Sequence, residues 1–359
     1  MIESRDLTKR FDDVTAVDHV NAVITEGSVF GLVGTNGAGK STFLRLVTGI
    51  LKPDEGRVLI DGEDVFTNPR IRERFFYIPD DQYFFSNVTP REMMTFFAKI
   101  YPFFDRARFS KLANAFDLPE SRKINTFSKG MKKQLSIILG ISAGTKYLLC
   151  DETFDGLDPV MRQAVKSLLA EDMTERGLTP VITSHNLREL EDICDHVGLL
   201  HKGGILFSRD LDDMKLNIHK LQCVPKPGMT ADDLVAYLSG THDVSFDPDD
   251  AETSAAAVSG DGIKSDSAAV VSTDEAESAS AGMTEAASGT ANASDGLSVI
   301  RVEQRGSILT LTVRGSEFEL LSRMERIDTV FYEIVPLSLE EIFISETEVT
   351  GYDIKKLLF

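Results

Sequence analysis

Three short runs of hydrophobic residues along the chain predict buried strands. They are "SVFGLVG" (28–34), "KYLLCD" (146–151) and "PVITS" (180–184), and each is followed by a loop and a helical stretch. This alternation is typical of an α/β fold in which helices pack against a mostly parallel sheet. After the first strand, residues 41–49 predict a helix that ends at Gly49.

Between the first two strands, residues 89–142 have the pattern of a helical insert. The insert opens with "TPRE" (89–92), which has the Thr and Glu spacing of a capping box and a proline at the first helical position. Asp105 and Ser128 are predicted to cap two further helices, because short polar side chains accept hydrogen bonds from the free N–H groups of a first turn.

The pattern changes after about residue 213. Residues 244–296 consist mainly of Ala, Ser, Gly, Thr and acids with almost no aromatic residues, a composition that buries too little surface to fold. On either side of them, 214–243 and 297–359 carry strand and helix patterns. We therefore predict a first domain over 1–213, followed by a small α+β domain that a disordered acidic insert interrupts.

The overall composition is that of a globular protein, with 42% hydrophobic and 26% charged residues and a net charge of −19. Eleven acids and one base between residues 247 and 295 account for −10 of this charge. A net charge this acidic argues against a nucleic-acid scaffold, because such proteins carry a basic face, so we expect no nucleic-acid partner.

The three cysteines, Cys150, Cys194 and Cys223, show neither paired nor metal-ligand spacing, which fits core residues in a reducing compartment. The N-terminal residues are charged, without the apolar core of a signal peptide, and no window approaches the roughly 18 apolar residues of a membrane span. We therefore expect a cytoplasmic protein that meets a membrane only through a partner.

The clearest motif is "GTNGAGKST" (34–42), which fits G-x-x-x-x-G-K-[ST] and lies between a predicted strand and a predicted helix. In such a loop, backbone N–H groups surround a phosphate, the lysine reaches the β- and γ-phosphates, and the next hydroxyl ligates Mg²⁺. The sequence therefore predicts ATP and Mg²⁺ as ligands. The predicted cradle consists of Gly34, Thr35, Asn36, Gly37, Ala38, Gly39, Lys40, Ser41 and Thr42.

A second motif, "YLLCDE" (147–152), is an apolar strand that ends in two carboxylates. The end of such a strand lies at the edge of the sheet where α/β folds bind their ligands. Asp151 is predicted to hold Mg²⁺, directly or through water. Glu152 is predicted to orient and deprotonate the attacking water.

Three shorter motifs, "FSKGM" (127–131), "FDGLDP" (154–159) and "TSH" (183–185), lie around and after this strand. With them, residues 1 to about 213 resemble an ABC-type ATPase, the nucleotide-binding subunit of an ABC transporter. The resemblance implies a P-loop core of ABC type, with an N-terminal antiparallel β part and the helical insert. It places Asp158 at the end of the D-loop and His185 at the switch-histidine position. Phe11 stands where the family stacks an aromatic ring on adenine, although a core position is the alternative.

"FSKGM" resembles the signature motif of this family, with Ser128 and Gly130 at the key positions and Lys129 and Met131 as variants. In the family, two subunits pair head to tail, and the signature helix of one subunit caps the γ-phosphate held by the other. Ser128 and the Gly130 N–H would then act across a dimer interface. One copy of each motif implies a homodimer or a pairing with a sister ABC subunit.

One motif departs from the family pattern. After "Y-x-P", where the family has the glutamine of the Q-loop, this chain has Asp80 and Asp81, and Gln82 lies two residues later. Asp80 and Gln82 both offer oxygen atoms to a metal ion. The sequence leaves open which of the two approaches it.

The tail "PLSLEEIFI" (336–344) and the closing "GYD" (351–353) resemble ATP-binding subunits of bacterial ABC-2-type exporters. This resemblance favours a Mg²⁺-dependent ATPase that drives an integral membrane permease on another polypeptide. The alternative is a soluble, non-transport ABC ATPase that acts on ribosomes or DNA. Lys40, Asp151, Glu152 and His185 argue against a third interpretation, an inactive regulatory subunit. The sequence does not indicate a transported substrate.

Overall fold

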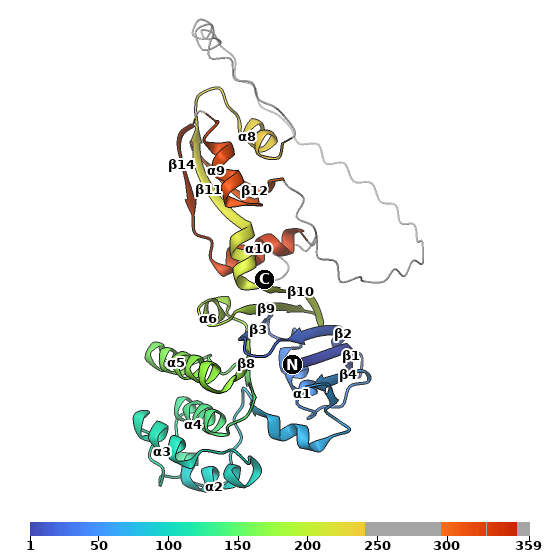
Figure 1. The fold of residues 1–359 in the computed structure, drawn as a ribbon, viewed down its shortest axis with the longest axis vertical. Helices are drawn as coiled ribbons and strands as arrows, with labels where there is room; N and C mark the ends of the chain where they lie inside the picture. The colour runs from blue at the N-terminus through green and yellow to red at the C-terminus, as the bar shows by residue number, and fades with distance from the viewer. Residues whose placement is uncertain (241–295, 328, 350–359) are drawn as a thin grey trace, which may run out of the picture.

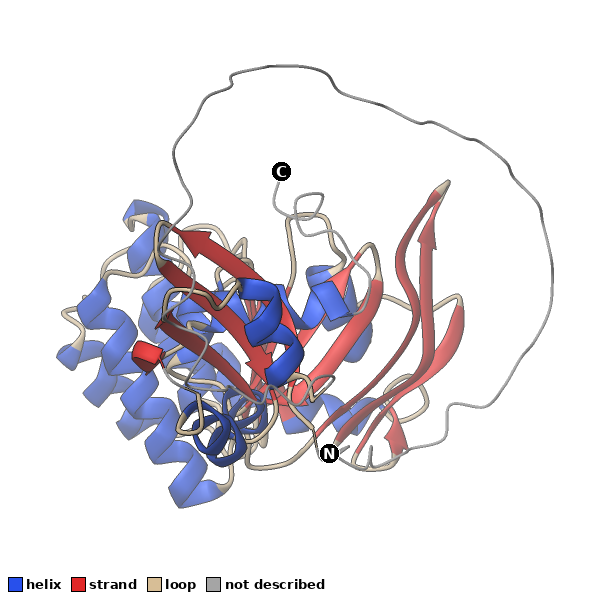
Figure 2. Cartoon of the chain, turned by 90° about the horizontal axis from the view of Figure 1, so that it is seen from above, coloured by secondary structure: helices blue, strands red, loops and turns tan. Residues whose placement is uncertain are grey.

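The computed structural model describes residues 1–240, 296–327 and 329–349, which form three sheets and their covering helices (Figure 1). The predicted insert 244–296 and the closing "GYD" lie outside the described residues, apart from Gly296. Seen from above, helices gather on one side of the molecule and the long strands near the N-terminus on the other (Figure 2).

The central sheet has the order β10-β9-β3-β8-β7-β6. All its neighbouring strands run parallel except β10, which is antiparallel to β9 at one edge. The strands are β3 (Phe30–Val33), β6 (Phe75–Ile78), β7 (Tyr147–Asp151), β8 (Thr179–Ser184), β9 (His196–His201) and β10 (Gly204–Asp210). Every residue of β3, β7 and β8 is buried, as expected for parallel strands covered on both faces. The predicted α/β fold with a mostly parallel sheet is confirmed.

An antiparallel sheet in the order β2-β1-β4-β5 precedes and flanks the central one. Its strands are β1 (Ile2–Phe11), β2 (Val14–Ile24), β4 (Glu55–Ile60) and β5 (Glu63–Asp64). Helix α1 (Lys40–Val47) packs between the two sheets, because Phe43, Leu44 and Leu46 share one hydrophobic cluster with both of them. This packing between the two sheets fixes the start of α1, where the phosphate motif lies.

The helical insert consists of α2 (Pro90–Ile100), α3 (Arg106–Ala115) and α4 (Lys129–Ser142), at the bottom of Figure 1. The structure also has two 3₁₀ helices, η1 (Pro69–Arg74) before β6 and η2 (Ile124–Thr126) before α4. The side chains of Thr89, Asp105 and Ser128 accept hydrogen bonds from the first turns of the three helices, and Thr89 forms a complete capping box with Glu92. Together with α5 (Pro159–Arg176), α4 covers the second face of the central sheet.

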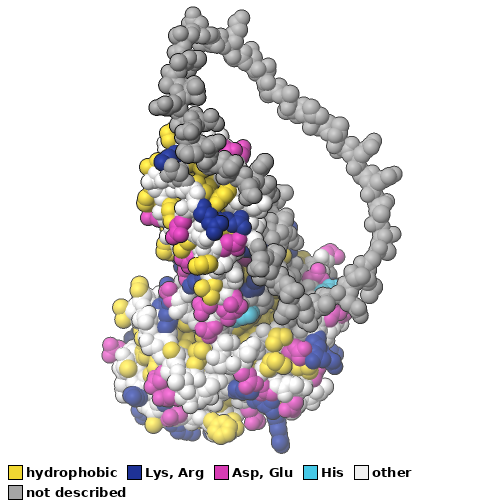
Figure 3. Space-filling view, turned by 45° about the horizontal axis from the view of Figure 1, so that its top comes forward, with side chains coloured by type: hydrophobic (Ala, Val, Ile, Leu, Met, Phe, Trp, Pro, Cys, Tyr) yellow, Lys and Arg dark blue, Asp and Glu magenta, His cyan; other side chains and the backbone are white. Residues whose placement is uncertain are grey.

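The C-terminal part has a third sheet, in the order β12-β13-β11-β14, with its own hydrophobic cluster. Its elements are α7 (Leu211–Asn217), β11 (Ile218–Pro225), α8 (Ala231–Leu238), β12 (Ser298–Arg305), β13 (Ile308–Arg314), α9 (Glu317–Met324), β14 (Thr329–Val335) and α10 (Leu339–Val349). On the face that Figure 3 shows, acidic and basic side chains are interspersed over this part and the larger part below it.

The last helix, α10, packs against the hydrophobic core around the central sheet. Leu339, Ile342 and Phe343 belong to the same hydrophobic cluster as the second face of the central sheet. The Phe343 ring packs edge-on against Phe207 of β10, with 5.0 Å between the ring centroids. The Leu339 N–H donates to Glu191 Oε1 over 3.1 Å, at the end of α6 (Leu187–Glu191).

The three cysteines are free and buried, as expected for core residues. Burial raises the pKa of the Cys150 thiol to about 12.

Candidate functional site

The predicted phosphate loop turns from the end of β3 into the first turn of α1. Gly39 has a φ of +108°, in the left-handed region that favours glycine, and a Cβ there would lie 2.1 Å from the carbonyl oxygen of Ala16. At Gly34 a Cβ would lie 2.4 Å from the carbonyl oxygen of Leu200. The loop therefore takes its shape only because these two positions lack side chains.

A cavity of about 350 Å³ opens above this loop, at the ends of β7 and β8. It is lined by Ala16, Asn36, Gly37, Gly39, Lys40, Ser41, Thr42, Asp80, Glu152, Asp155 and His185. Chain segments far apart in sequence thus meet around the phosphate loop. The cavity lies at the carboxyl edge of the parallel strands, where α/β folds bind their ligands.

Three side chains in this cavity form a connected chain of polar contacts. Lys40 Nζ lies 3.0 Å from Glu152 Oε1, and His185 Nδ1 lies 2.7 Å from Glu152 Oε2. Lys40 is almost fully buried, and its ammonium also donates to the carbonyl oxygens of Gly34 and Thr35 over 2.6 and 3.2 Å. Both carboxylate oxygens of Glu152 are therefore directed by cationic or polar neighbours.

Asp151 lies beside this chain and is fully buried. Its Oδ1 accepts hydrogen bonds from Ser41 Oγ (3.0 Å) and Thr183 Oγ1 (2.8 Å), and its Oδ2 accepts one from the Tyr77 hydroxyl (3.0 Å). Burial and the Asp151 charge raise the pKa of Tyr77, so the phenol keeps the proton that it donates. These contacts fix the carboxylate beside the Ser41 hydroxyl.

The residues present fit Mg²⁺. Ser41 and Asp151 place two hard oxygen atoms next to each other, and Mg²⁺ is usually held by one or two carboxylates together with substrate phosphates and water. The described residues include no group of three or more His, Cys, Asp or Glu side chains that could hold a metal. Phosphate oxygens would have to complete such a site.

The backbone at Glu152 is unusual. Its φ is +48°, in the left-handed region that non-glycine residues seldom occupy. The Glu152 N–H donates to the carbonyl oxygen (3.2 Å) and to Oγ1 (3.1 Å) of Thr183, and its carbonyl oxygen accepts a hydrogen bond from Lys133 Nζ (2.8 Å). Neighbouring elements therefore hold this peptide in place on both sides.

Of the two Q-loop candidates, Asp80 lines the cavity and Gln82 does not. The Gln82 side-chain amide donates to the carbonyl oxygens of Pro79 (3.0 Å) and Asp80 (2.7 Å), within its own loop.

Several predicted residues lie away from this cavity. Ser128 caps α4 by accepting from the Met131 N–H, and Asp158 caps α5 by accepting from the Met161 N–H. Neither they nor Gly130 line the cavity. Phe11 does not line it either, and with 44% of its surface exposed it is not a core residue. Lys9 Nζ lies 5.4 Å from the centre of the Phe11 ring.

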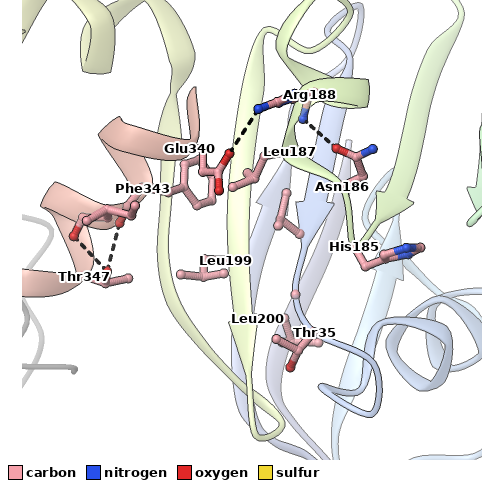
Figure 4. A pocket seen from close by; sticks show the side chains of 13 residues that line it. Thr35, His185, Asn186, Leu187, Arg188, Leu199, Leu200, Glu340, Phe343 and Thr347 are labelled. Atoms are coloured by element: carbon pink, nitrogen blue, oxygen red, sulfur yellow. Dashed lines mark hydrogen bonds and ion pairs between the residues drawn. The ribbon is translucent and has the colours of Figure 1, made fainter. Parts of the chain in front are cut away.

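The remaining loop residues face other surroundings. Ala38 is buried. Gly34 and Thr35 line a second cavity of about 330 Å³, which lies between the phosphate loop, α6 and α10. Figure 4 shows Glu340 and Phe343 of α10 on one side of it, and Thr35 and His185 on the other. His185 lines both cavities.

Sequence reasoning missed Ala16 and Asp155, which line the cavity. It also missed Tyr77, Thr183 and Lys133, which bond to Asp151 or Glu152. Thr183 belongs to the quoted "TSH", and Tyr77 precedes the quoted Q-loop residues, so both lie next to recognised motifs. Lys133 donates hydrogen bonds to the carbonyl oxygens of Glu152 and Asp155, about 20 residues further along the chain. No local sequence pattern indicates such a contact.

No helix in the described part of the chain combines the length and the hydrophobicity needed to cross a bilayer.

Residues 17–155 match the family model described as ABC transporter. The chain is 36% identical over 222 residues to the ABC transporter ATP-binding protein YtrB of Bacillus subtilis, an alignment that covers 62% of this chain and 76% of that protein. It is 34% identical over 218 residues to the bacitracin transport ATP-binding protein BcrA of Bacillus licheniformis, covering 60% and 71%.

Among solved structures, a dimeric ATP-binding cassette in a post-hydrolysis state, bound to ADP and Pi, superposes with a TM-score of 0.54. The two chains are 22% identical, and the superposition covers 59% of this chain and 99% of the cassette. This similarity shows a shared fold. The sequence relatives and this fold lead to one conclusion: the chain belongs to the family of ABC transporter ATP-binding proteins.

Proposed function

We propose that the protein hydrolyses ATP with Mg²⁺, dimerises head to tail around two ATP molecules, and drives a separate membrane permease, as an exporter. It would then lie in the cytoplasm, at the inner face of the membrane, through its permease. The observation that carries this proposal is the contact chain Lys40–Glu152–His185 beside the Ser41–Asp151 pair.

Glu152 is the proposed general base. Glu152 lines the cavity above the phosphate loop, where its carboxylate would meet a water molecule beside a bound γ-phosphate. His185 would orient the carboxylate and help to stabilise the transferred group. Mg²⁺, held by Ser41 and Asp151, would neutralise the charge that develops on the phosphate oxygens.

Lys40 has a second role in this proposal. Its ammonium is bonded to the carboxylate of Glu152 and to carbonyl oxygens of its own loop. ATP binding would draw it to the β- and γ-phosphates, because phosphate oxygens are strong acceptors for a cation. Glu152 would then be free to accept a proton from water.

The proposed head-to-tail dimer is supported by the position of the signature turn. Ser128 is exposed at the start of α4, and neither it nor Gly130 contributes to the chain's own cavity. A Cβ at Gly130 would meet only Ser128 Oγ, at 3.9 Å, so this turn has open space before it. Backbone N–H groups at a helix N-terminus suit a phosphate, which a second subunit would supply.

A permease partner is supported by three exposed aromatic residues, Tyr83, Phe85 and Phe96, which we call the aromatic surface. Phe85 packs on both others, with ring centroids 6.3 Å from Tyr83 and 5.0 Å from Phe96. Clustered exposed aromatic rings are typical of protein interaction sites. Tyr83 lies three residues after Asp80, which lines the cavity above the phosphate loop. We call this cavity the nucleotide cavity, and the aromatic surface adjoins the loop of Asp80.

Transport is further supported by the relatives, one of which is named for bacitracin transport. The direction of transport, export, rests on the resemblance of the tail alone. Phe11 remains the proposed partner of the adenine ring, and 44% of its surface is exposed.

The variant Glu152→Gln tests the hydrolytic role. It preserves the shape of the side chain but removes its basicity, so ATP should still bind while turnover falls by at least about 10²-fold. The ATP-loaded dimer should also persist, because separation waits on loss of the γ-phosphate. Steady-state phosphate release and light scattering with ATP and Mg²⁺ measure the two effects. Turnover at the wild-type rate would remove Glu152 from this role.

A further inference from the structure

Lys133 lies on the second turn of α4, five residues after Ser128, and most of its side chain is buried. Its side chain is 13% exposed. The Nζ atom donates to the carbonyl oxygens of Glu152 (2.8 Å) and Asp155 (2.7 Å) and lies 3.7 Å from Asp80 Oδ1. The ammonium group thus makes two hydrogen bonds to backbone carbonyls and an ion pair with Asp80.

All three of these positions line the nucleotide cavity. Asp80 belongs to the Q-loop, and Glu152 and Asp155 belong to the loop after β7. Lys133 itself does not line the cavity, so it would act on the reaction through other residues rather than by touching ATP. Its contacts hold the two loops against α4.

The contact with Glu152 is the most consequential of the three. Glu152 occupies a left-handed backbone conformation, which costs free energy and persists only where the surroundings hold it. The peptide group after Glu152 carries the carbonyl oxygen that Lys133 binds. A hydrogen bond from a charged donor is stronger than one between neutral groups, so this contact opposes relaxation of that peptide.

The direction of the Glu152 carboxylate follows from this backbone. In the left-handed conformation the side chain reaches both Lys40 and His185. If the backbone relaxed, the carboxylate would leave this position, and small displacements of a reacting group reduce turnover strongly.

We propose that Lys133 is a positioning residue for ATP hydrolysis, which holds Glu152 in its reactive orientation and ties it to the signature helix. This inference rests on the proposed role of Glu152. Ser128 and Gly130 lie at the start of α4. If α4 moved when these residues bound a partner's ATP, the movement would change the position of the chain's own Glu152. Lys133 thereby links the two nucleotide sites of the proposed dimer.

The variant Lys133→Met tests the inference, because it keeps the length of the side chain and removes the charge and the donors. We expect kcat for ATP to fall about tenfold to a hundredfold, as for a misplaced reacting group, while the Kd for ATP stays about the same. Lys133→Arg, which keeps the charge and several donors, should recover much of the loss. If Lys133→Met fails to fold, Lys133→Gln replaces it, with a smaller fall in kcat expected.

Lys166→Met is the matched control. Lys166 is 11% exposed and donates to Asp192 Oδ2 over 3.0 Å, so the substitution also removes a partly buried ammonium, but one outside the nucleotide cavity. We expect its kcat to match that of the wild type. An equal fall in kcat for Lys166→Met and Lys133→Met would mean that losing a buried lysine has a general structural effect, and would overturn the inference.

A double-mutant cycle with Glu152→Gln separates this inference from the proposed function. If Lys133 acts through Glu152, adding Lys133→Met to Glu152→Gln should lower the residual turnover less than about twofold. If Lys133→Met lowers turnover in the Glu152→Gln background as much as in the wild type, Lys133 does not act through Glu152. This inference then fails, while the proposed function stands. Wild-type turnover in Glu152→Gln itself would overturn the proposed function and this inference together.

Discussion

Asp80 and Gln82 belong to the same short loop, but their side chains have different surroundings. Asp80 lines the nucleotide cavity and lies 3.7 Å from the ammonium of Lys133. Gln82 donates its side-chain amide to two carbonyl oxygens of the loop itself. A carboxylate beside a polyphosphate is unfavourable unless a cation accompanies it, and Mg²⁺ and Lys133 would both supply positive charge there.

This contrast predicts that Asp80, and not Gln82, takes the place of the family glutamine. In Asp80→Asn the Mg²⁺ concentration for half-maximal ATP turnover should rise about tenfold, the lower range for a lost outer ligand of a metal site. Gln82→Ala is the paired control, and its Mg²⁺ dependence should stay close to that of the wild type. Titration of turnover with Mg²⁺ compares them. A larger shift in Gln82→Ala than in Asp80→Asn would reverse the assignment.

Local motifs explain why much of the site could be predicted at the residue scale. The phosphate loop and the strand ending in Asp151 and Glu152 are short contiguous patterns. The structure brings most of the loop and Glu152 to one cavity, with Asp151 buried beside it. Tyr77 and Lys133 could not be predicted in the same way, because their roles depend on contacts between distant segments. Tyr77 and Asp151, for example, are 74 residues apart.

At the scale of elements, too, local features could be predicted from the sequence and contacts between distant segments could not. The caps at Thr89, Asp105 and Ser128 were predicted correctly, because a cap depends on a few consecutive residues. The packing of α10 against the core around the central sheet was not predicted. The apolar residues of α10 could be buried against the C-terminal sheet or against the central sheet. Only the fold brings Phe343 to Phe207 and the Leu339 N–H to Glu191.

The aromatic surface, formed by the loop after β6 and by α2, gives a prediction about the membrane partner. Phe85→Ala together with Phe96→Ala should reduce co-purification of the full chain with a membrane protein, because exposed rings in a cluster lose most of their contact area on truncation. Recovery of the tagged chain with solubilised membranes, after expression in its native host, measures this.

Phe331→Ala is the matched control for that measurement. Phe331 of β14 is 49% exposed, close to the 46% of Phe85, and it should leave co-purification unchanged. Equal recovery of the Phe85/Phe96 variant and the control would contradict a partner at the aromatic surface. Recovery with ribosomes or DNA in place of a membrane protein would instead favour a non-transport ABC ATPase.

At the scale of the whole molecule, the two turns that we propose to bind phosphate do not face a common cavity. Lys40 and Ser41 line the cavity at the start of α1, whereas Ser128 and Gly130 stand at the exposed start of α4. A second subunit in a head-to-tail arrangement would bring one turn of each kind to each ATP. The composite site is therefore the central claim of the proposed function.

Two single substitutions allow this claim to be tested. Lys40→Ala removes the lysine of the phosphate loop. Gly130→Glu places a carboxylate at the signature turn, where it would oppose the γ-phosphate of a partner. The added side chain has room within the subunit, since a Cβ there meets only Ser128 Oγ at 3.9 Å. Each variant alone should be inactive, and Gly130→Glu should still bind ATP as a monomer.

The most direct measurement is the ATP turnover of the two variants mixed in equal amounts. A mixed dimer has one composite site with Lys40 and Gly130 both intact, and a second site with both defects. With random pairing, intact sites should amount to about a quarter of those in the wild type, and turnover should recover toward that level. Loss of ATP affinity in monomeric Gly130→Glu, with no recovery on mixing, would show instead that the signature turn serves its own subunit's ATP and would contradict the composite site.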